Sequence, residues 1–189
     1  MKILQLAFAG AVVLASLTST AFAQAKEYIT LTLKDGPVVI ELMPDVAPKH
    51  VARIKELAAA GDYNNVAFHR VIPGFMAQTG DVQYGNMEKD FKGDMAGMGG
   101  SSKPNVEAEF SKVPFERGTV GMARSQDPNS ANSQFFIMFA RGDFLNGQYT
   151  VVGKVVEGMD NVDKIKKGDE ANNGSVTDPD RMISVKVGK

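Results

Sequence analysis

The residues best suited to chemistry stand in one short run, Phe68-His69-Arg70-Val71-Ile72-Pro73-Gly74-Phe75-Met76-Ala77-Gln78. Side chains of an extended chain alternate between two faces, so Arg70 shares a face with Ile72, and Met76 shares one with Gln78 beyond the Pro-Gly bend. A permanent cation and an amide beside apolar side chains could bind a peptide group next to a proline ring. The run offers no obvious nucleophile and no set of metal ligands.

A second run lies well beyond the first and reads Ser133-Gln134-Phe135-Phe136-Ile137. Together with FHRVIPGFMAQTGD at 68–81, it resembles the cyclophilin family of peptidyl-prolyl cis-trans isomerases, and the similarity covers nearly the whole chain after its N-terminal part. The resemblance implies a mainly β fold, a closed eight-stranded antiparallel β-barrel capped by two α-helices. It also implies an enzyme that accelerates cis-trans exchange at X–Pro bonds without cofactor, nucleotide or metal.

The resemblance makes Arg70 the catalytic arginine. Amide resonance gives rotation about a peptide bond a barrier of about 18–20 kcal/mol. In the twisted transition state the proline nitrogen regains its lone pair, and a guanidinium donor aimed there would bind that state better than either planar isomer. A lysine lacks the planar fork of donors and should substitute poorly.

The resemblance also assigns further residues to substrate binding. Four apolar residues match the family's proline pocket, namely Phe75, Met76, Phe136 and Leu145. Gln78 matches the residue that hydrogen-bonds the substrate backbone. The rest of the matched groove consists of Met122, Ala123, Arg124, Gln134, Phe144 and Tyr149. The alternative for the apolar residues is a plain core position in a strand, as we expect for Phe135, whose side chain should point into the barrel.

Three groove residues depart from the pattern of many family members. Arg124 stands where a small neutral or amide residue is common, which would favour acidic residues before the proline. Phe144 and Tyr149 stand where many eukaryotic members carry tryptophan and histidine. Phenylalanine has no hydrogen-bond donor, so cyclosporin-type inhibitors are expected to bind weakly while isomerase activity is kept.

The first 23 residues are typical of a cleaved export signal. Lys2 precedes a nearly continuous apolar stretch, 3–17, and Ala21-Phe22-Ala23 is a small-x-small cleavage site, so the mature chain should begin at Gln24. The alternative is an uncleaved membrane anchor, but the apolar stretch is short for a span. No later segment is apolar enough to cross a bilayer, so no membrane association is expected after cleavage.

The mature chain, residues 24–189, is long enough for one isomerase domain with a real core. Cleavage removes one lysine and no acidic residue, so the formal net charge changes from −1 to −2. That charge gives no footprint for nucleic acid. An exported chain without cysteine indicates a bacterial periplasm. There we expect a monomer that assists the folding of envelope proteins, its partners being proline-containing polypeptides, unfolded or partly folded.

Hydrophobic periodicity predicts many short strands and two helices. Strands 29–33 and 38–42 should form a hairpin, followed by a helix over 45–60 with Asp45 as its cap, Pro48 in its first turn and Gly61 as its stop. Residues 80–104 lack periodicity and indicate a long surface loop. The remaining predictions are strands 66–72, 75–78, 118–123, 133–139, 149–155 and 183–187 and a helix over 161–167. This pattern also favours a closed antiparallel barrel.

The two histidines are not predicted to bind a metal. Neither His50 nor His69 belongs to a Cys or His-x-x-x-His pattern. His50 is expected on the exposed side of the first helix, and His69 should make a structural hydrogen bond. Three methionines of the 80–104 loop, Met87, Met95 and Met98, could bind a soft metal or form an adaptable binding surface, although a mobile loop is the default interpretation.

Two other functions compete with isomerase activity. A serine hydrolase would need a Gly-x-Ser-x-Gly nucleophile elbow, which the chain lacks. A proline-peptide-binding module or holdase chaperone could use the same groove without turnover. Binding alone requires only the apolar pocket, so the presence of Arg70 within the full motif favours catalysis.

Overall fold

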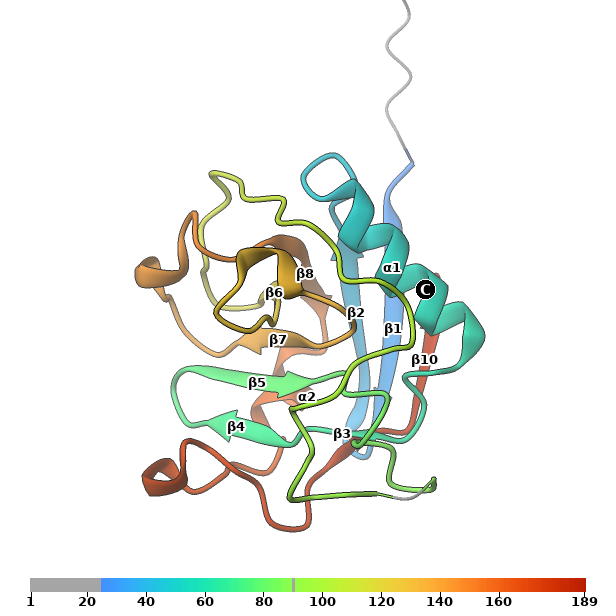
Figure 1. Cartoon of the computed structure of the whole chain (residues 1–189), viewed down its shortest axis with the longest axis vertical. Helices are drawn as coiled ribbons and strands as arrows, with labels where there is room; N and C mark the ends of the chain where they lie inside the picture. Colours follow the sequence, from blue (N-terminus) through green and yellow to red (C-terminus); the bar gives the residue numbers. More distant parts are fainter. Residues whose placement is uncertain (1–24, 90) are drawn as a thin grey trace, which may run out of the picture.

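The computed structural model describes residues 25–89 and 91–189, and the predicted export signal lies outside them. Two α-helices are found in this part of the chain, α1 (Pro48–Ala60) and α2 (Met159–Asp163) (Figure 1). The strands are β1 Glu27–Leu33, β2 Gly36–Leu42, β3 Val66–Ala67, β4 Arg70–Ile72, β5 Met76–Thr79, β6 Thr119–Met122, β7 Phe135–Met138, β8 Val151–Glu157, β9 Arg181–Met182 and β10 Ser184–Val187. Short 3-10 helices lie at Pro128–Ser130, Asp143–Leu145 and Glu170–Asn172.

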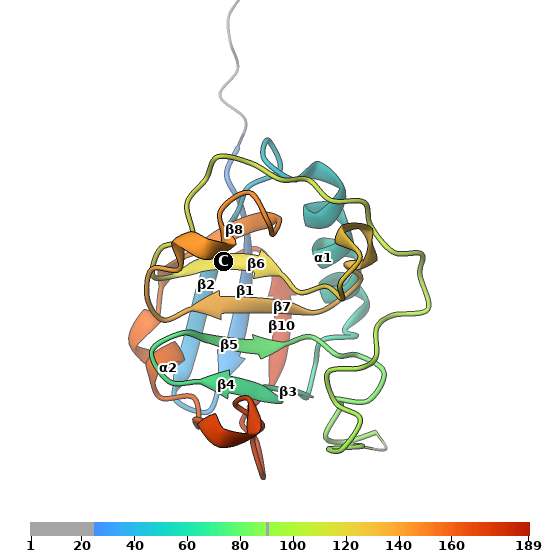
Figure 2. The same cartoon turned by 60° about the vertical axis from the view of Figure 1, so that its left-hand side comes forward.

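Eight strands form one antiparallel sheet in the order β10-β1-β2-β8-β6-β7-β5-β4. Figure 2 shows β4, β5, β7 and β6 lying side by side in front of β1, β2 and β10, so the sheet is strongly curled. The prediction of a closed barrel is wrong, because no ladder among the described residues joins the outer strands β4 and β10. The sheet is an open half-barrel, with α1 packed against β10 and α2 against β2.

The sheet stays open because the predicted strand 66–72 is interrupted. Its first part, β3, pairs with β9 in a separate two-stranded sheet. After this pair, the backbone N–H of Phe68 donates to the carbonyl of Asp180, and that of Val71 donates to the carbonyl of Gly174. The loop before β9, rather than β10, therefore satisfies the backbone groups at this edge.

The predicted hairpin is confirmed as β1 and β2, and it supplies one wall of the core. Along β1, the inward Ile29, Leu31 and Leu33 are buried, while Thr30 and Thr32 are more exposed. Apolar side chains of β2, α1 and the other strands complete the main core, among them Val38, Ile40, Leu42, Val51, Ile54, Leu57, Val71, Ala77, Phe135 and Ile137. This core fixes the frame on which the candidate site is built.

Helix α1 begins without the cap that the sequence predicts. Its N-cap residue is Ala47, and no local side chain accepts a hydrogen bond there, so the assignment of Asp45 as the cap is wrong. Glu109 takes this role from a distant segment, accepting from the backbone N–H groups of Lys49 and His50, each at 3.1 Å. The predicted end is confirmed, because Gly61 has a left-handed φ of 77°.

The prediction that His50 faces solvent is also wrong. Its side chain is fully buried, and Nδ1 lies 2.7 Å from Glu109 Oε2. The carboxylate of Glu109 therefore binds the helix backbone and the imidazole together. His50 stands four residues before Ile54 and seven before Leu57, so the helical period in fact places it on the apolar face, and only its polar side chain suggested exposure.

The segment 80–104 contains no helix or strand over its described residues, as predicted, but a buried carboxylate organises it. Asp81 has no solvent exposure. Its Oδ1 accepts from the N–H groups of Gln83 and Tyr84, and its Oδ2 accepts from those of Gly97 and Gly99 at 2.7 and 2.9 Å. The Asp81 side chain thus holds residues 83–84 and residues 97–99 together at the start of this segment.

The remaining predicted strands are confirmed, with small shifts at their ends. The helix predicted over 161–167 is shorter and earlier, running from Met159 to Asp163 after Gly158, whose φ is 82°. No helix among the described residues is long and apolar enough to cross a membrane.

Candidate active site

The two strands of the FHRVIPGFMAQ motif place Arg70 opposite Gln78. β4 and β5 pair in antiparallel register, joined by a turn in which Gly74 has a φ of 67°. Val71 and Ala77 point into the main core, so the alternating Arg70 and Gln78 lie on the other face. The local alternation predicted from the sequence is therefore what brings the cation and the amide together.

The sheet face that carries Arg70 and Gln78 continues onto the next strand, β7, where it carries Phe136. In β7, Phe136 pairs with Gln78 of β5 on one side and with Gly121 of β6 on the other. A side chain at Gly121 would clash, since a Cβ there would lie 2.6 Å from both the Phe115 and Phe136 rings. The glycine therefore lets the Phe136 ring lie low over the sheet, stacked on Phe115 with centroids 5.7 Å apart.

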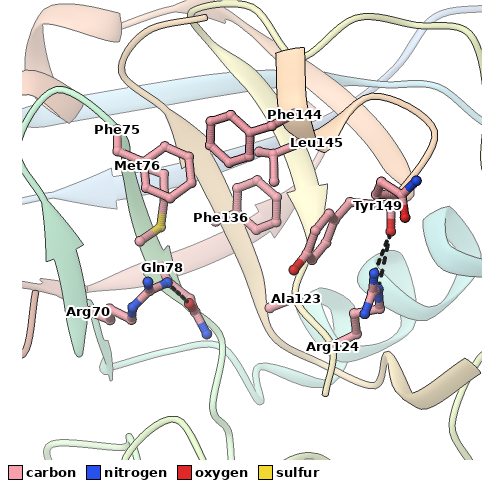
Figure 3. A pocket seen from close by; sticks show the side chains of 11 residues that line it. Arg70, Phe75, Met76, Gln78, Ala123, Arg124, Phe136, Phe144, Leu145 and Tyr149 are labelled. Carbon is pink, nitrogen blue, oxygen red and sulfur yellow. Dashed lines mark hydrogen bonds between the residues drawn. The ribbon is translucent and has the colours of Figure 1, made fainter. Parts of the chain in front are cut away.

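A cavity of about 450 Å³ opens over the face that carries Arg70, Gln78 and Phe136 (Figure 3). Its floor is apolar, because Met76, Phe136 and Leu145 are buried in a small second core. Phe144 is 70% exposed at the rim, with its ring centroid 5.4 Å from that of Phe75. The lining residues are Arg70, Phe75, Met76, Gln78, Ala123, Arg124, Phe136, Phe144, Leu145, Gln148 and Tyr149.

Arg70 is held at one edge of this cavity by three hydrogen bonds. Its Nε donates to the backbone carbonyl of Asn173 at 3.0 Å, Nη2 donates to Asn173 Oδ1 at 2.9 Å, and Nη1 donates to Gln78 Oε1 at 3.1 Å. Burial lowers the pKa of Arg70, but an arginine side chain stays protonated in proteins. The site thus presents a fixed cation beside an apolar hollow.

Gln78 and Gln134 connect Arg70 to the 80–104 segment. Gln78 Nε2 donates to Gln134 Oε1 at 2.9 Å, and Gln134 Nε2 donates to the carbonyl oxygens of Gly97 and Gly99 at 3.0 and 2.7 Å. The same two glycines donate their N–H groups to Asp81. A continuous hydrogen-bonded path therefore leads from the buried carboxylate to the guanidinium.

Arg124 forms the opposite edge, next to Tyr149 (Figure 3). Its guanidinium donates to the carbonyl oxygens of Gln148 and Ser125 at 2.8 Å and lies 4.4 Å from the centre of the Tyr149 ring. The Tyr149 ring in turn meets Phe136 edge-on, with centroids 5.8 Å apart. These contacts fix the position of the Arg124 charge.

The structure gathers most of the predicted substrate-binding residues around one cavity. Gln134 lies beside it and lines a neighbouring cavity of about 260 Å³. Met122 lines neither cavity, because its side chain is only 1% exposed and packs in the main core. Two residues were missed. Asn173 lies in a polar loop without a motif, and Gln148 contributes its backbone carbonyl, so no side-chain pattern indicated either one.

His69 was predicted to make a structural hydrogen bond, and this is wrong. Its ring is buried, and neither ring nitrogen has a hydrogen-bond partner among the described residues. The ring packs against Gly97, where a Cβ would lie 2.9 Å from His69 Cδ2. Burial lowers the pKa of His69, which favours the neutral ring. In residues 25–89 and 91–189, no group of three or more His, Cys, Asp or Glu side chains could hold a metal ion.

Comparison with known proteins identifies the family and the fold. Residues 28–187 match the family model described as cyclophilin type peptidyl-prolyl cis-trans isomerase/CLD. A probable peptidyl-prolyl cis-trans isomerase of Brucella suis is 67% identical over 87% of this chain and 84% of its own length. Peptidyl-prolyl cis-trans isomerase B of Escherichia coli is 39% identical over 73% of this chain and 83% of its own.

Two crystal structures of cyclophilins have a similar fold. The cyclophilin AquaCyp293 of Hirschia baltica has a TM-score of 0.69 at 27% identity, covering 84% of this chain and 72% of that one. A cyclophilin-type isomerase of Cryptosporidium parvum, crystallised in the presence of the dipeptide Ala-Pro, has a TM-score of 0.71 at 25% identity, covering 86% and 99%. The mainly β architecture with two helices is thereby confirmed. The chain belongs to the cyclophilin-type peptidyl-prolyl cis-trans isomerase family and is an enzyme of that class.

Proposed function

We propose that the enzyme binds an X–Pro segment of another polypeptide in the cavity between Arg70 and Tyr149. The proline ring would lie on the apolar floor formed by Met76, Phe136 and Leu145. Gln78, at the edge of the cavity, would hydrogen-bond the substrate backbone. The observation that carries this proposal is the fixed guanidinium of Arg70 beside an apolar hollow of about 450 Å³.

Arg70 acts on the amide in the transition state. As the X–Pro bond twists, conjugation is lost and the nitrogen becomes a hydrogen-bond acceptor. A donor already held in place stabilises this state without reorganising, and it gains nothing comparable from either planar isomer. No covalent bond forms or breaks, so the step requires no nucleophile, metal or cofactor.

Proline-containing polypeptides are the substrates that this arrangement fits. The Cryptosporidium parvum relative was crystallised in the presence of Ala-Pro, which supports a proline-peptide ligand for a cavity of this fold. The direct test is two-dimensional NMR exchange on a short X–Pro peptide, where catalytic amounts of the enzyme should produce cis-trans cross-peaks that are absent without it. Unchanged exchange at saturating peptide would reject the proposal.

The cellular role follows from the N-terminal sequence and the absence of cysteine. Residues 1–23 would direct export, and the mature enzyme would assist the folding of periplasmic proteins, where uncatalysed proline isomerisation takes tens to hundreds of seconds. Mass spectrometry of the protein from a cell-envelope fraction should find a chain that begins at or near Gln24. A cytosolic protein that retains residues 1–23 would contradict this role.

A holdase that uses the same groove is the competing function, and the exposed aromatic Phe144 at the rim favours some capacity for unfolded chains. A substitution of Arg70 distinguishes the two functions, because holding an unfolded chain does not require stabilisation of the twisted amide. Suppression of client aggregation should survive in Arg70→Ala if holding is independent of turnover. Loss of both activities together would tie holding to the catalytic site.

A further inference from the structure

The two arginines of the site differ from the other arginines of the chain. The sequence contains six. Four of them form ion pairs with carboxylates, namely Arg53 with Glu56, Arg117 with Asp163, Arg141 with Asp143 and Arg181 with Glu88. Within the described residues, Arg70 and Arg124 donate only to amide and carbonyl oxygens. Both positive charges of the site therefore lack an internal counter-ion.

The described residues that line the cavities around these two charges include no acidic side chain either. Three cavities lie along this face: the main one of about 450 Å³, the neighbour of about 260 Å³ on the Gln134 side, and a third of about 240 Å³ beyond Arg70. Among the described residues, no aspartate or glutamate lines any of the three. A protein with an overall formal charge of −1 thus carries a locally positive binding face.

Arg124 borders two of these cavities. It lines both the main cavity and the 260 Å³ cavity. Carbonyl contacts orient a guanidinium but leave its net charge in place. The nearest acidic residue in sequence, Asp127, caps the following 3-10 helix by accepting from Asn129 N–H at 2.8 Å. It does not line either cavity.

We propose that Arg124 makes the enzyme select polypeptides with a carboxylate directly before or after the proline. This inference rests on the proposed function, since it presumes that the proline occupies the main cavity. A glutamate or aspartate side chain that extends toward Arg124 would meet an unneutralised guanidinium whose position is already fixed by Gln148 and Tyr149. A lysine there would meet like charge. The preference is therefore electrostatic and follows the sign of the neighbouring residue.

The test is a set of peptides that differ only in one residue beside the proline. Glutamate, glutamine or lysine is placed before or after it, and kcat/KM is measured by NMR exchange at low salt. At whichever of the two positions glutamate is preferred, the wild-type kcat/KM should be about threefold to tenfold higher for the glutamate peptide than for the lysine peptide. This is the size expected for a partly exposed charge pair. About 0.5 M salt should reduce this ratio toward one.

Variants at Arg124 attribute the preference to one side chain. Arg124→Gln should bring the glutamate-to-lysine ratio close to one, and Arg124→Glu should invert it. The matched control is Arg141→Gln, an exposed arginine that pairs with Asp143 and lines none of the three cavities; it should leave the ratio unchanged.

Two different failures can be told apart in this experiment. Turnover of all peptides with a wild-type ratio near one, or a ratio that Arg124→Gln does not change, would overturn the selectivity while leaving the isomerase site intact. Absence of turnover with every peptide would instead reject the proposed function itself.

Discussion

Arg70 and Gln78 face each other across β4 and β5, and Arg70 Nη1 donates a hydrogen bond of 3.1 Å to Gln78 Oε1. Gln78 Nε2 in turn donates to Gln134 Oε1, and Gln134 Nε2 donates to two carbonyl oxygens in the 97–99 segment. That segment is tied in turn to the buried carboxylate of Asp81. The Arg70 guanidinium is therefore oriented in part by Asp81, which does not line the cavity.

The substitution Asp81→Asn tests this positioning. An amide can keep its oxygen toward Gln83 and Tyr84, but its NH₂ group would then face the N–H groups of Gly97 and Gly99, which have no acceptor. Leaving buried donors unpaired costs about 1–3 kcal/mol each, and the released segment should misplace Gln134. We expect kcat/KM to fall about threefold to thirtyfold in a protein that still folds, because small misplacements reduce catalysis strongly.

A double-mutant cycle distinguishes positioning from general destabilisation. In a Gln134→Leu background the path is already broken, so Asp81→Asn should cause little further loss of kcat/KM. Glu109→Gln serves as the control, since it weakens the start of α1 at a side chain that does not line the cavity and should lower stability without lowering kcat/KM. Full additivity of the Asp81 and Gln134 effects would contradict the path.

The buried pair of His50 and Glu109 predicts a pH-dependent stability. Burial lowers the pKa of His50 despite the neighbouring carboxylate, with the charges of Arg53 and Lys49 acting in the same direction. The folded protein therefore binds this proton less readily than the unfolded chain. The stabilisation is fully present above the unfolded pKa of about 6.5 and is lost as pH falls below it toward the folded pKa.

Denaturant unfolding between pH 7.5 and 5.5 checks this expectation. Stability of the wild type should fall over that range, and the fall should be shallower in His50→Gln. A remaining slope is expected, because burial also lowers the pKa of His69. Burial raises the pKa of Glu109, but hydrogen bonds from His50 and the helix backbone lower it on balance. The stability that Glu109 contributes is therefore lost only at the lower pH where carboxylates become protonated. Identical slopes in the two proteins would argue against a buried neutral His50.

Phe144 predicts weak inhibition by cyclosporin-type cyclic peptides. It stands exposed at the rim of the cavity and offers no donor to an inhibitor carbonyl. Burying that carbonyl without a partner should cost about 1–3 kcal/mol, which is about a 5- to 150-fold weaker complex. Phe144→Trp should tighten inhibition in a side-by-side titration without a comparable gain in kcat/KM. Nanomolar inhibition of the wild type that is unchanged by the substitution would refute the idea.

Sequence patterns predicted the parts of the site that depend on local alternation. Period-two spacing predicted the alternation within these strands, and the register of β4, β5 and β7 places Arg70, Gln78 and Phe136 on one face. Contacts between distant segments had no such signal. Glu109 caps α1 from about sixty positions away, and Asn173 reaches Arg70 across about a hundred.

The errors have the same physical origin. Local sequence favoured Asp45 as the helix cap, but α1 begins later, and the distant carboxylate of Glu109 accepts hydrogen bonds from its free N–H groups. A closed barrel was implied by the family, whereas the backbone groups next to β4 find partners in the 174–180 loop. In both places a backbone donor was satisfied by a segment that no periodicity connects to it.

The proposed role of the Arg70 guanidinium is to stabilise the twisted X–Pro amide. Its direct test is kcat/KM of Arg70→Ala and wild type for one X–Pro peptide, measured by NMR exchange, with circular dichroism and thermal unfolding confirming that the variant is folded. We predict a loss of at least about tenfold; a loss of about 10²-fold would correspond to about 2.7 kcal/mol of transition-state stabilisation. Arg70→Lys should restore little of it. Wild-type kcat/KM in a folded Arg70→Ala protein would contradict the account.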